Sequence, residues 1–189
     1  MYQDLIISGF GGQGVLVIGR LLSYAAMREN KYVTFLPSYG PIMRGGTAHC
    51  TVVISSRPIG SPIIQKPLSA ILMNVPSVLK FEGKVKHGGL VLYNSDLVDR
   101  TMSKRGNMEK VFVPATTIAQ KVGSDRVANM VLAGAFIERT KVVSFDSASA
   151  SILEAVGERH RDFVHLDEEA LRRGVEFVRS GMSAGLKKD

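Results

Sequence analysis

Residues 4–19 read DLIISGFGGQGVLVIG, and this stretch decides the fold class. The segment from Asp4 to Ser8 predicts a short buried strand, because its apolar residues run together and a glycine cluster ends them. The segment from Val15 to Met27 predicts a helix, since its apolar residues recur at helical spacing at Val15, Ile18, Leu22 and Ala26. The chain therefore opens as strand, glycine loop and helix.

Outward from this opening, Tyr32–Leu36 is a second β-branched and aromatic run that Pro37 closes. It predicts the second strand of a βαβ unit, paired in parallel with the first through a right-handed crossover. Further strands are expected at Ala48–Ser55, Ser69–Asn74, Gly89–Asn94 and Lys110–Val113, and helices at Pro76–Phe81, Thr116–Val122, Ala128–Arg139, Ala148–Arg159 and Asp167–Arg179. In the last helix Asp167 is expected to be the N-cap and Gly181 the stop. The pattern predicts a single α/β domain over residues 1–189, with a Rossmann-like mixed, mostly parallel sheet flanked by helices.

The composition narrows the classes of function. With 45% hydrophobic and 22% charged residues among 189, the chain can bury a core, and its apolar runs are too short to cross a bilayer. No signal peptide or membrane association is expected, so we predict a cytoplasmic location. The single cysteine, Cys50, predicts a buried thiol and leaves this chain without the ligand set of a cluster. The net charge of +7 indicates an anionic partner, but its scattered distribution argues against nucleic acid.

The glycine loop is the first motif that carries chemistry. Gly9, Gly11 and Gly14 form a G-x-G-x-x-G pattern between a strand and a helix, which suits a tight turn, a close ligand approach and close helix–strand packing. The free N–H groups of the helix N-terminus then face an anion. A dinucleotide site would also need an acidic residue at the end of the second strand, where this chain has Leu36 to Ser38. A phosphate site and a purely structural turn both remain open.

The second motif is the loop Pro37–Gly46, which follows the expected second strand. Its prolines restrict the backbone, its glycines free it, and donors are supplied by Ser38, Tyr39 and Arg44, the last followed by Gly45 and Gly46. This chemistry suits anion recognition. The alternative is a rigid connection in which Arg44 forms a surface or intersubunit ion pair.

Three segments together resemble the gamma subunit of 2-oxoacid:ferredoxin oxidoreductases, the group that includes pyruvate, 2-oxoglutarate and ketoisovalerate oxidoreductases. They are the opening Gly9–Gly14, the loop that runs from Ser38-Tyr39-Gly40-Pro41 to Arg44-Gly45-Gly46, and Asn129-Met130 ahead of Gly134. The resemblance covers essentially the whole chain. One departure is Ile42, where this family often has an acidic residue, so a role attached to that position does not carry over.

The resemblance implies a complex that oxidatively decarboxylates a 2-oxoacid, joins the acyl group to coenzyme A and passes electrons to ferredoxin. Thiamine diphosphate would be bound by the alpha and beta subunits, and iron–sulfur clusters by beta or a delta subunit. This chain would hold no cofactor tightly and would contribute an intersubunit surface that contacts coenzyme A through Gly11, Gly12, Gln13, Gly14, Ser38, Tyr39, Arg44, Gly45, Gly46 and Asn129. For Asn129 a structural role is favoured over a ligand contact.

No residue is assigned to catalysis or to a metal, because the four histidines lack metal-ligand spacing and an orienting acid nearby in sequence. Two other hypotheses are kept. One is a stand-alone NAD(P)-linked oxidoreductase that uses the glycine loop alone. The other is a non-enzymatic regulatory module that binds a small anion.

Overall fold

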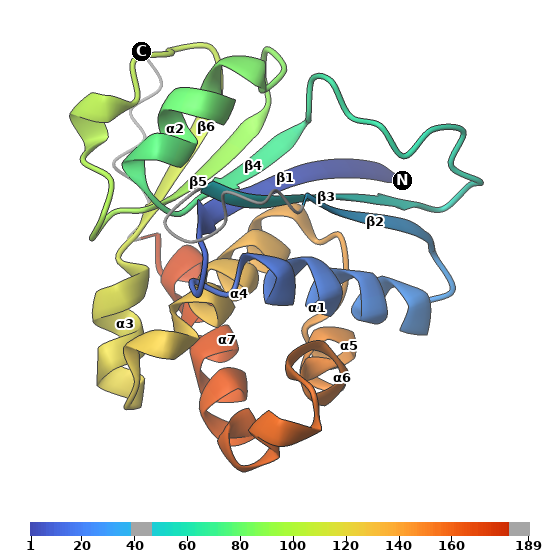
Figure 1. Cartoon of the computed structure of the whole chain (residues 1–189), viewed down its shortest axis with the longest axis vertical. Helices are drawn as coiled ribbons and strands as arrows, with labels where there is room; N and C mark the ends of the chain where they lie inside the picture. Colours follow the sequence, from blue (N-terminus) through green and yellow to red (C-terminus); the bar gives the residue numbers. More distant parts are fainter. Residues whose placement is uncertain (39–46, 182–189) are drawn as a thin grey trace.

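A six-stranded sheet forms the centre of the computed structural model, which describes residues 1–38 and 47–181 (Figure 1). Its strands are β1 (Tyr2–Phe10), β2 (Tyr32–Ser38), β3 (Thr47–Ser55), β4 (Ser69–Leu72), β5 (Leu90–Asn94) and β6 (Glu109–Val113). The spatial order is β2-β3-β1-β4-β5-β6. Every residue of β4 and β5 is buried, as expected of short apolar strands that are covered on both faces.

The sheet is mixed, which confirms the predicted fold class. Parallel pairing joins β1 to β4, β4 to β5 and β5 to β6, whereas β3 is antiparallel to both of its neighbours. The predicted parallel pairing of β1 with β2 is wrong, because β3 lies between them. The antiparallel ladder of β3 takes the edge of β1 that β2 was expected to occupy: its nine residues pair with all of β1, from Tyr2 opposite Ser55 to Phe10 opposite Thr47, and β2 pairs with the other edge of β3.

Helices cover both faces of the sheet (Figure 1). On one face lie α1 (Val15–Arg28) and α4 (Ala128–Thr140), together with α7 (Val164–Arg179), and on the opposite face lies α2 (Val75–Phe81). The remaining helices are α3 (Ala115–Val122), α5 (Phe145–Ser149) and α6 (Ile152–Val156), and short 3-10 segments span Glu82–Lys84, Arg100–Met102, Asp125–Val127 and Glu158–Phe163. The larger apolar core lies between the sheet and α1 and α4, and a smaller one lies under α2.

Helix α4 packs on α7 with almost no separation between the two backbones. A Cβ atom at Gly134 would lie 2.0 Å from the carbonyl oxygen of Leu171, and one at Gly174 would lie 2.0 Å from that of Val131. Only glycine permits so close an approach. This contact fixes the middle turns of α4 and α7 relative to each other.

Two expectations for the C-terminal region are wrong. The predicted helix Ala148–Arg159 is broken into α5, α6 and a 3-10 segment, because Gly157 has a φ of 88° and ends α6. Asp167 is not an N-cap: the 3-10 segment continues directly into α7, which begins at Val164, and Asp167 is buried within its first turn. The stop is as predicted, since α7 ends at Arg179 and Gly181 has a φ of 70°. Within the described ranges, no helix is long and apolar enough to cross a membrane.

Candidate ligand-binding site

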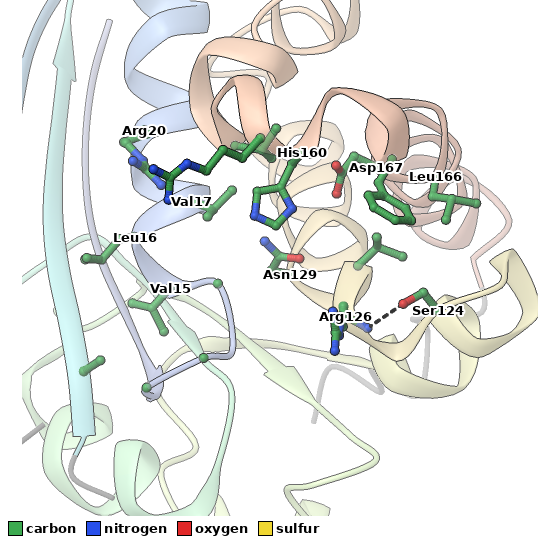
Figure 2. Close-up of a pocket in the computed structure, with 18 of the residues that line it drawn as sticks. Val15, Leu16, Val17, Arg20, Ser124, Arg126, Asn129, His160, Leu166 and Asp167 are labelled. Carbon is green, nitrogen blue, oxygen red and sulfur yellow. Dashed lines mark hydrogen bonds between the residues drawn. The ribbon is translucent and has the colours of Figure 1, made fainter. Parts of the chain in front are cut away.

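A cavity of about 850 Å³ lies at the carboxyl end of β1, between the glycine loop, α1, and the first turns of α4 and α7 (Figure 2). Its wall contains Phe10, Gly11, Gly12, Gly14, Val15, Leu16, Val17, Arg20, Ala48, Gly123, Ser124, Arg126, Val127, Asn129, Val156, Arg159, His160, Phe163, Leu166 and Asp167. The carboxyl ends of strands are where open α/β sheets bind ligands. A cavity of this size is within the usual range for small-molecule sites.

The glycine loop opens onto this cavity. Gly14 has a φ of 74° and occupies the N-cap of α1 in the left-handed conformation, so no side chain caps the first N–H groups of the helix. Gly11 and Gly12 are exposed along the cavity wall. Gln13 is used within the loop instead: its Oε1 accepts from the Phe10 amide at 2.6 Å and from Asn74 Nδ2 at 3.2 Å. The loop is therefore closed by its own glutamine, and the N-terminus of α1 is free for an anion.

The close packing expected of Gly14 against the sheet is wrong. A Cβ atom there would lie 2.4 Å from Nδ2 of Asn129, so the neighbour of Gly14 is the first turn of α4. The close approach of α1 to the sheet occurs at Gly19 instead, where a Cβ atom would lie 2.6 Å from Cε2 of Phe35 on β2 and 2.9 Å from Sγ of Cys50 on β3. The sequence shows a glycine that needs space but not which neighbour takes it, because Asn129 is 115 residues away in the chain.

Three arginines from separate elements border the cavity. Arg20 lies on α1, Arg126 on the 3-10 segment before α4, and Arg159 on the segment before α7. The Nε of Arg20 is buried and has no hydrogen-bond partner among the described residues. The sequence analysis missed all three, because they are scattered along the chain and only the fold brings them together. A guanidinium group suits phosphate, to which it donates two parallel hydrogen bonds.

Asn129, Asp167 and His160 lie on the side of the cavity that faces α1 (Figure 2). Asn129 is 5% exposed, and its Oδ1 is buried without a hydrogen-bond partner among the described residues. Asp167 is 7% exposed. Its burial raises the pKa of its carboxyl group to about 6, and the charges of His160 and His165 oppose this rise. Buried polar groups with perturbed pKa values in a cavity are typical of functional sites.

The second predicted motif is only partly described by the structure. Ser38 is the last residue of β2, half-buried and paired in register with His49, and it is not part of the cavity wall. Tyr39, Arg44, Gly45 and Gly46 lie outside the described residues. The chain is described again from Thr47, and Ala48 borders the cavity. The start of β3 lies beside the glycine loop, since Thr47 pairs in register with Phe10.

Cys50 is fully buried in β3, as predicted. Burial raises the pKa of its thiol to about 12, and its Sγ lies 3.6 Å from the carbonyl oxygen of Val15. In residues 1–38 and 47–181, no three histidine, cysteine, aspartate or glutamate side chains are grouped as a metal site. We therefore interpret this thiol as a packing group.

Two protein relatives establish the family. KorC, a 2-oxoglutarate synthase subunit of Methanothermobacter marburgensis, is 36% identical over 189 residues, covering 96% of this chain and 99% of KorC. VorA, a ketoisovalerate oxidoreductase subunit of the same organism, is 38% identical over 175 residues, covering 93% of this chain. The chain spans only 32% of the length of VorA.

A solved structure and a family model agree with these relatives. The gamma subunit of a keto/oxoacid ferredoxin oxidoreductase from Geobacter sulfurreducens superposes with a TM-score of 0.83 and 31% identity, covering 95% of this chain and 98% of that subunit. The family model of pyruvate ferredoxin/flavodoxin oxidoreductase matches residues 4–177. These matches support the gamma-type interpretation and not the stand-alone NAD(P)-linked enzyme. The chain belongs to the pyruvate ferredoxin/flavodoxin oxidoreductase family, as a gamma-type subunit.

Proposed function

We propose that this chain acts in a cytoplasmic 2-oxoacid:ferredoxin oxidoreductase complex, where it contributes the coenzyme A side of the reaction. The complex would oxidatively decarboxylate a 2-oxoacid, transfer the acyl group to coenzyme A and reduce ferredoxin. Its partners would be alpha and beta subunits, with a delta subunit in some complexes. Relatives named for 2-oxoglutarate and for ketoisovalerate support the reaction class and leave the oxoacid open.

The observation that carries this proposal is the cavity beside the glycine loop. Coenzyme A bears a diphosphate and a separate phosphate, and the cavity offers the uncapped N-terminus of α1 together with arginines from three elements. Arg20 fits this role well, because its Nε is buried and lacks a hydrogen-bond partner in the described part of the chain. A phosphate oxygen would supply that partner. The residues present therefore fit the phosphates of coenzyme A.

The work of this chain is binding and orientation. Thiamine diphosphate, which the family resemblance assigns to the alpha and beta subunits, would supply the decarboxylation chemistry there. The N–H groups of α1 and the guanidinium of Arg20 would hold the phosphates, and the acyl-accepting thiol would reach toward a partner subunit. The chain itself has one cysteine, and that cysteine is buried, so clusters would be held by other subunits.

A subunit-omission assay tests this assignment. The purified chain with 2-oxoacid, thiamine diphosphate and coenzyme A is expected to reduce no dye, and addition of the partner subunits should restore reduction that depends on coenzyme A. Dye reduction by this chain alone would refute the division of labour. So would full coenzyme A-dependent activity from the partners without this chain.

The loop that contains Ser38, Tyr39, Arg44, Gly45 and Gly46 is proposed to contribute further phosphate contacts on the same side. Arg44→Ala in the assembled complex should weaken the apparent affinity for coenzyme A by roughly tenfold, the order of one charge-assisted hydrogen bond. Arg44→Lys should weaken it less, because lysine keeps the charge but loses the planar fork. If the complex instead dissociates in size-exclusion chromatography while the intact fraction responds normally to coenzyme A, Arg44 is an assembly residue.

A further inference from the structure

Strand β2 forms one edge of the sheet, and no other strand in the described ranges pairs with its outer side (Figure 1). A strand edge of this kind presents a row of unpaired N–H and C=O groups that can pair with another chain. Proteins usually block such edges with charged side chains, bulges or prolines. The seven residues of β2, YVTFLPS, include no charged side chain, and their register with β3 has no bulge. Among these residues only Pro37, near the carboxyl end, protects the edge.

The hydrogen bonds of the sheet fix which residues of β2 direct their backbone outward. The Ser56 amide donates to the Met1 carbonyl oxygen at 3.0 Å, so these two residues, which follow the β1–β3 register by one step, form a hydrogen-bonded pair. Such pairs alternate along antiparallel strands, so the even-numbered residues of β3 face β1 and the odd-numbered residues face β2. The odd-numbered residues of β3 pair with the even-numbered residues of β2. The outer backbone groups therefore belong to Val33, Phe35 and Pro37, and Pro37 offers only its carbonyl oxygen.

The side chains of β2 alternate between the two faces of the sheet. Val33 and Phe35 pack against the larger core, on the face that α1 covers. Tyr32 and Leu36 lie on the opposite face and are 51% and 42% exposed, with the half-buried Thr34 between them. The edge therefore combines free backbone groups with uncovered apolar side chains, which is the combination that favours addition of another strand.

We propose that two copies of this chain pair edge to edge through β2, antiparallel and around a two-fold axis at Thr34, so that their two sheets form one continuous sheet. This inference goes beyond the proposed function, because it concerns the assembly of the chain with itself. Val33 then lies opposite Phe35 of the second copy. Both residues direct their backbone outward, so each of the two symmetry-related pairs exchanges two hydrogen bonds. The two-fold symmetry closes the edge on both copies at once.

The occupant is a second copy because β2 is complementary to itself. About the axis at Thr34, an aromatic residue lies opposite an aliphatic one on each face: Tyr32 opposite Leu36, and Phe35 opposite Val33. Pairs of this kind stabilise sheets, and no like charges meet, since β2 carries none. An axis one residue later, at Phe35, would instead place Val33 opposite a proline that cannot donate and Thr34 opposite Leu36. The self-complementary register is therefore the one centred on Thr34.

The mass of the purified full-length chain in solution tests the pairing. Sedimentation velocity at micromolar concentration should give twice the 20.5 kDa of one chain. Thr34→Lys should give a monomer, because two lysines would meet at the axis. Thr51→Lys is the matched control: Thr51 is also half-buried, pairs with Leu36 on the same face of the sheet, and lies on β3, away from the edge. This control should remain a dimer.

Disulfide cross-linking tests the register. Under mild oxidation Thr34→Cys should form a covalent dimer, because residues opposite each other outside the hydrogen-bonded pairs have Cβ atoms about 4.5 Å apart. Tyr32→Cys and Leu36→Cys chains, mixed and allowed to exchange, should form a cross-link that contains one chain of each kind. Neither variant alone should cross-link, since its own two cysteines would lie roughly 13 Å apart along the strands. Cys50 does not interfere, because it is fully buried.

Three results would overturn the proposal. They are a wild-type chain that sediments at the mass of one copy, a folded Thr34→Lys variant that keeps the wild-type mass, and the absence of the mixed cross-link between positions 32 and 36. A monomeric chain whose assembly with the partner subunits is lost in Thr34→Lys would assign the edge to a different subunit. Circular dichroism shows whether each variant folds, and the wild-type mass decides where one does not. None of these measurements depends on coenzyme A.

Discussion

Two carboxylates are buried to nearly the same extent but differ in their hydrogen bonding and in their surroundings. Glu82, 8% exposed, follows α2, and its Oε1 accepts hydrogen bonds from the Tyr93 hydroxyl at 2.8 Å and from the Ser103 hydroxyl. Arg105 donates to the Glu82 carbonyl oxygen at 2.9 Å. Asp167, 7% exposed, borders the cavity, and burial raises the pKa of its carboxyl group to about 6.

The difference is that Glu82 has hydrogen-bond partners within the fold, whereas Asp167 borders a cavity. The network around Glu82 satisfies its acceptors within the fold and ties α2 to the segment before β6, so its contribution is stability. Asp167 lies in the cavity wall, where burial favours the neutral form of its carboxyl group, so the fold gains no stability from its charge. A buried carboxyl group with a raised pKa beside a cavity is typical of binding sites.

The largest effect is expected from breaking the Glu82 network. Glu82→Leu removes the acceptor that the buried hydroxyl groups of Tyr93 and Ser103 share and leaves them only each other, 2.9 Å apart, which should lower the free energy of unfolding by about 2–4 kcal/mol. Glu82→Gln should cost less, because its amide oxygen can still accept. Urea denaturation measures both, and a loss below about 1 kcal/mol for Glu82→Leu would mean that the network is not structural.

The next effect concerns the contact between Gly14 of the glycine loop and Asn129 of α4. Gly14→Ala should lower the free energy of unfolding by about 2–3 kcal/mol, because the residue has a positive φ and its new methyl group meets Asn129. Gly12→Ala is the control: its φ is 93°, but nothing lies within 4 Å, so about 1 kcal/mol is expected. Equal losses in urea denaturation would show that backbone strain alone matters.

Asp167→Asn should stabilise the unliganded chain at pH 7.5 by about 1–3 kcal/mol. The pKa of this carboxyl group is raised in the folded state from 3.8 to about 6, so ionisation is less favourable there than in the unfolded chain. The stability of the wild type is therefore highest below pH 3.8 with respect to this group and falls as the pH rises through about 6. The gain from Asp167→Asn should accordingly vanish near pH 4, and a gain independent of pH would contradict the assignment.

The smallest effect on stability is expected at Arg20. Replacement by methionine removes a buried Nε that has no hydrogen-bond partner in the described ranges and keeps much of the side-chain volume. The free energy of unfolding should change by less than about 1 kcal/mol. Arg28 is its counterpart at the end of α1, where it is paired with Glu154, and Arg28→Met should cost a similar small amount. A large loss at Arg20 alone, seen in thermal denaturation, would make it a structural residue.

Local patterns predicted most of the elements and the position of the glycine loop. Residues 5–28 contain the apolar run of β1, the glycines after it and the apolar spacing of α1. Each of these patterns is local, so it can be recognised without knowledge of distant contacts. The place of β3 between β1 and β2 could not be read in this way, because strand pairing depends on contacts between distant residues.

The candidate site was less predictable for the same reason. Gly11, Gly12, Gly14 and Asn129 were predicted and do border the cavity, whereas Gln13 closes the loop instead. Arg20, Arg126 and Arg159 meet only through the packing of α1, α4 and α7. Asp167 was misassigned because an acid near a helix start fits an N-cap in sequence, and only the earlier start of α7 shows that it is buried.

The central claim, that the cavity beside the glycine loop holds the phosphates of coenzyme A, is tested most directly by steady-state kinetics of the assembled complex. Arg20→Met should raise the KM for coenzyme A by roughly tenfold and leave the KM for the 2-oxoacid within about twofold, while Arg28→Met changes neither. An unchanged KM for coenzyme A in an intact Arg20→Met complex, or the same increase in the Arg28→Met complex, would contradict it.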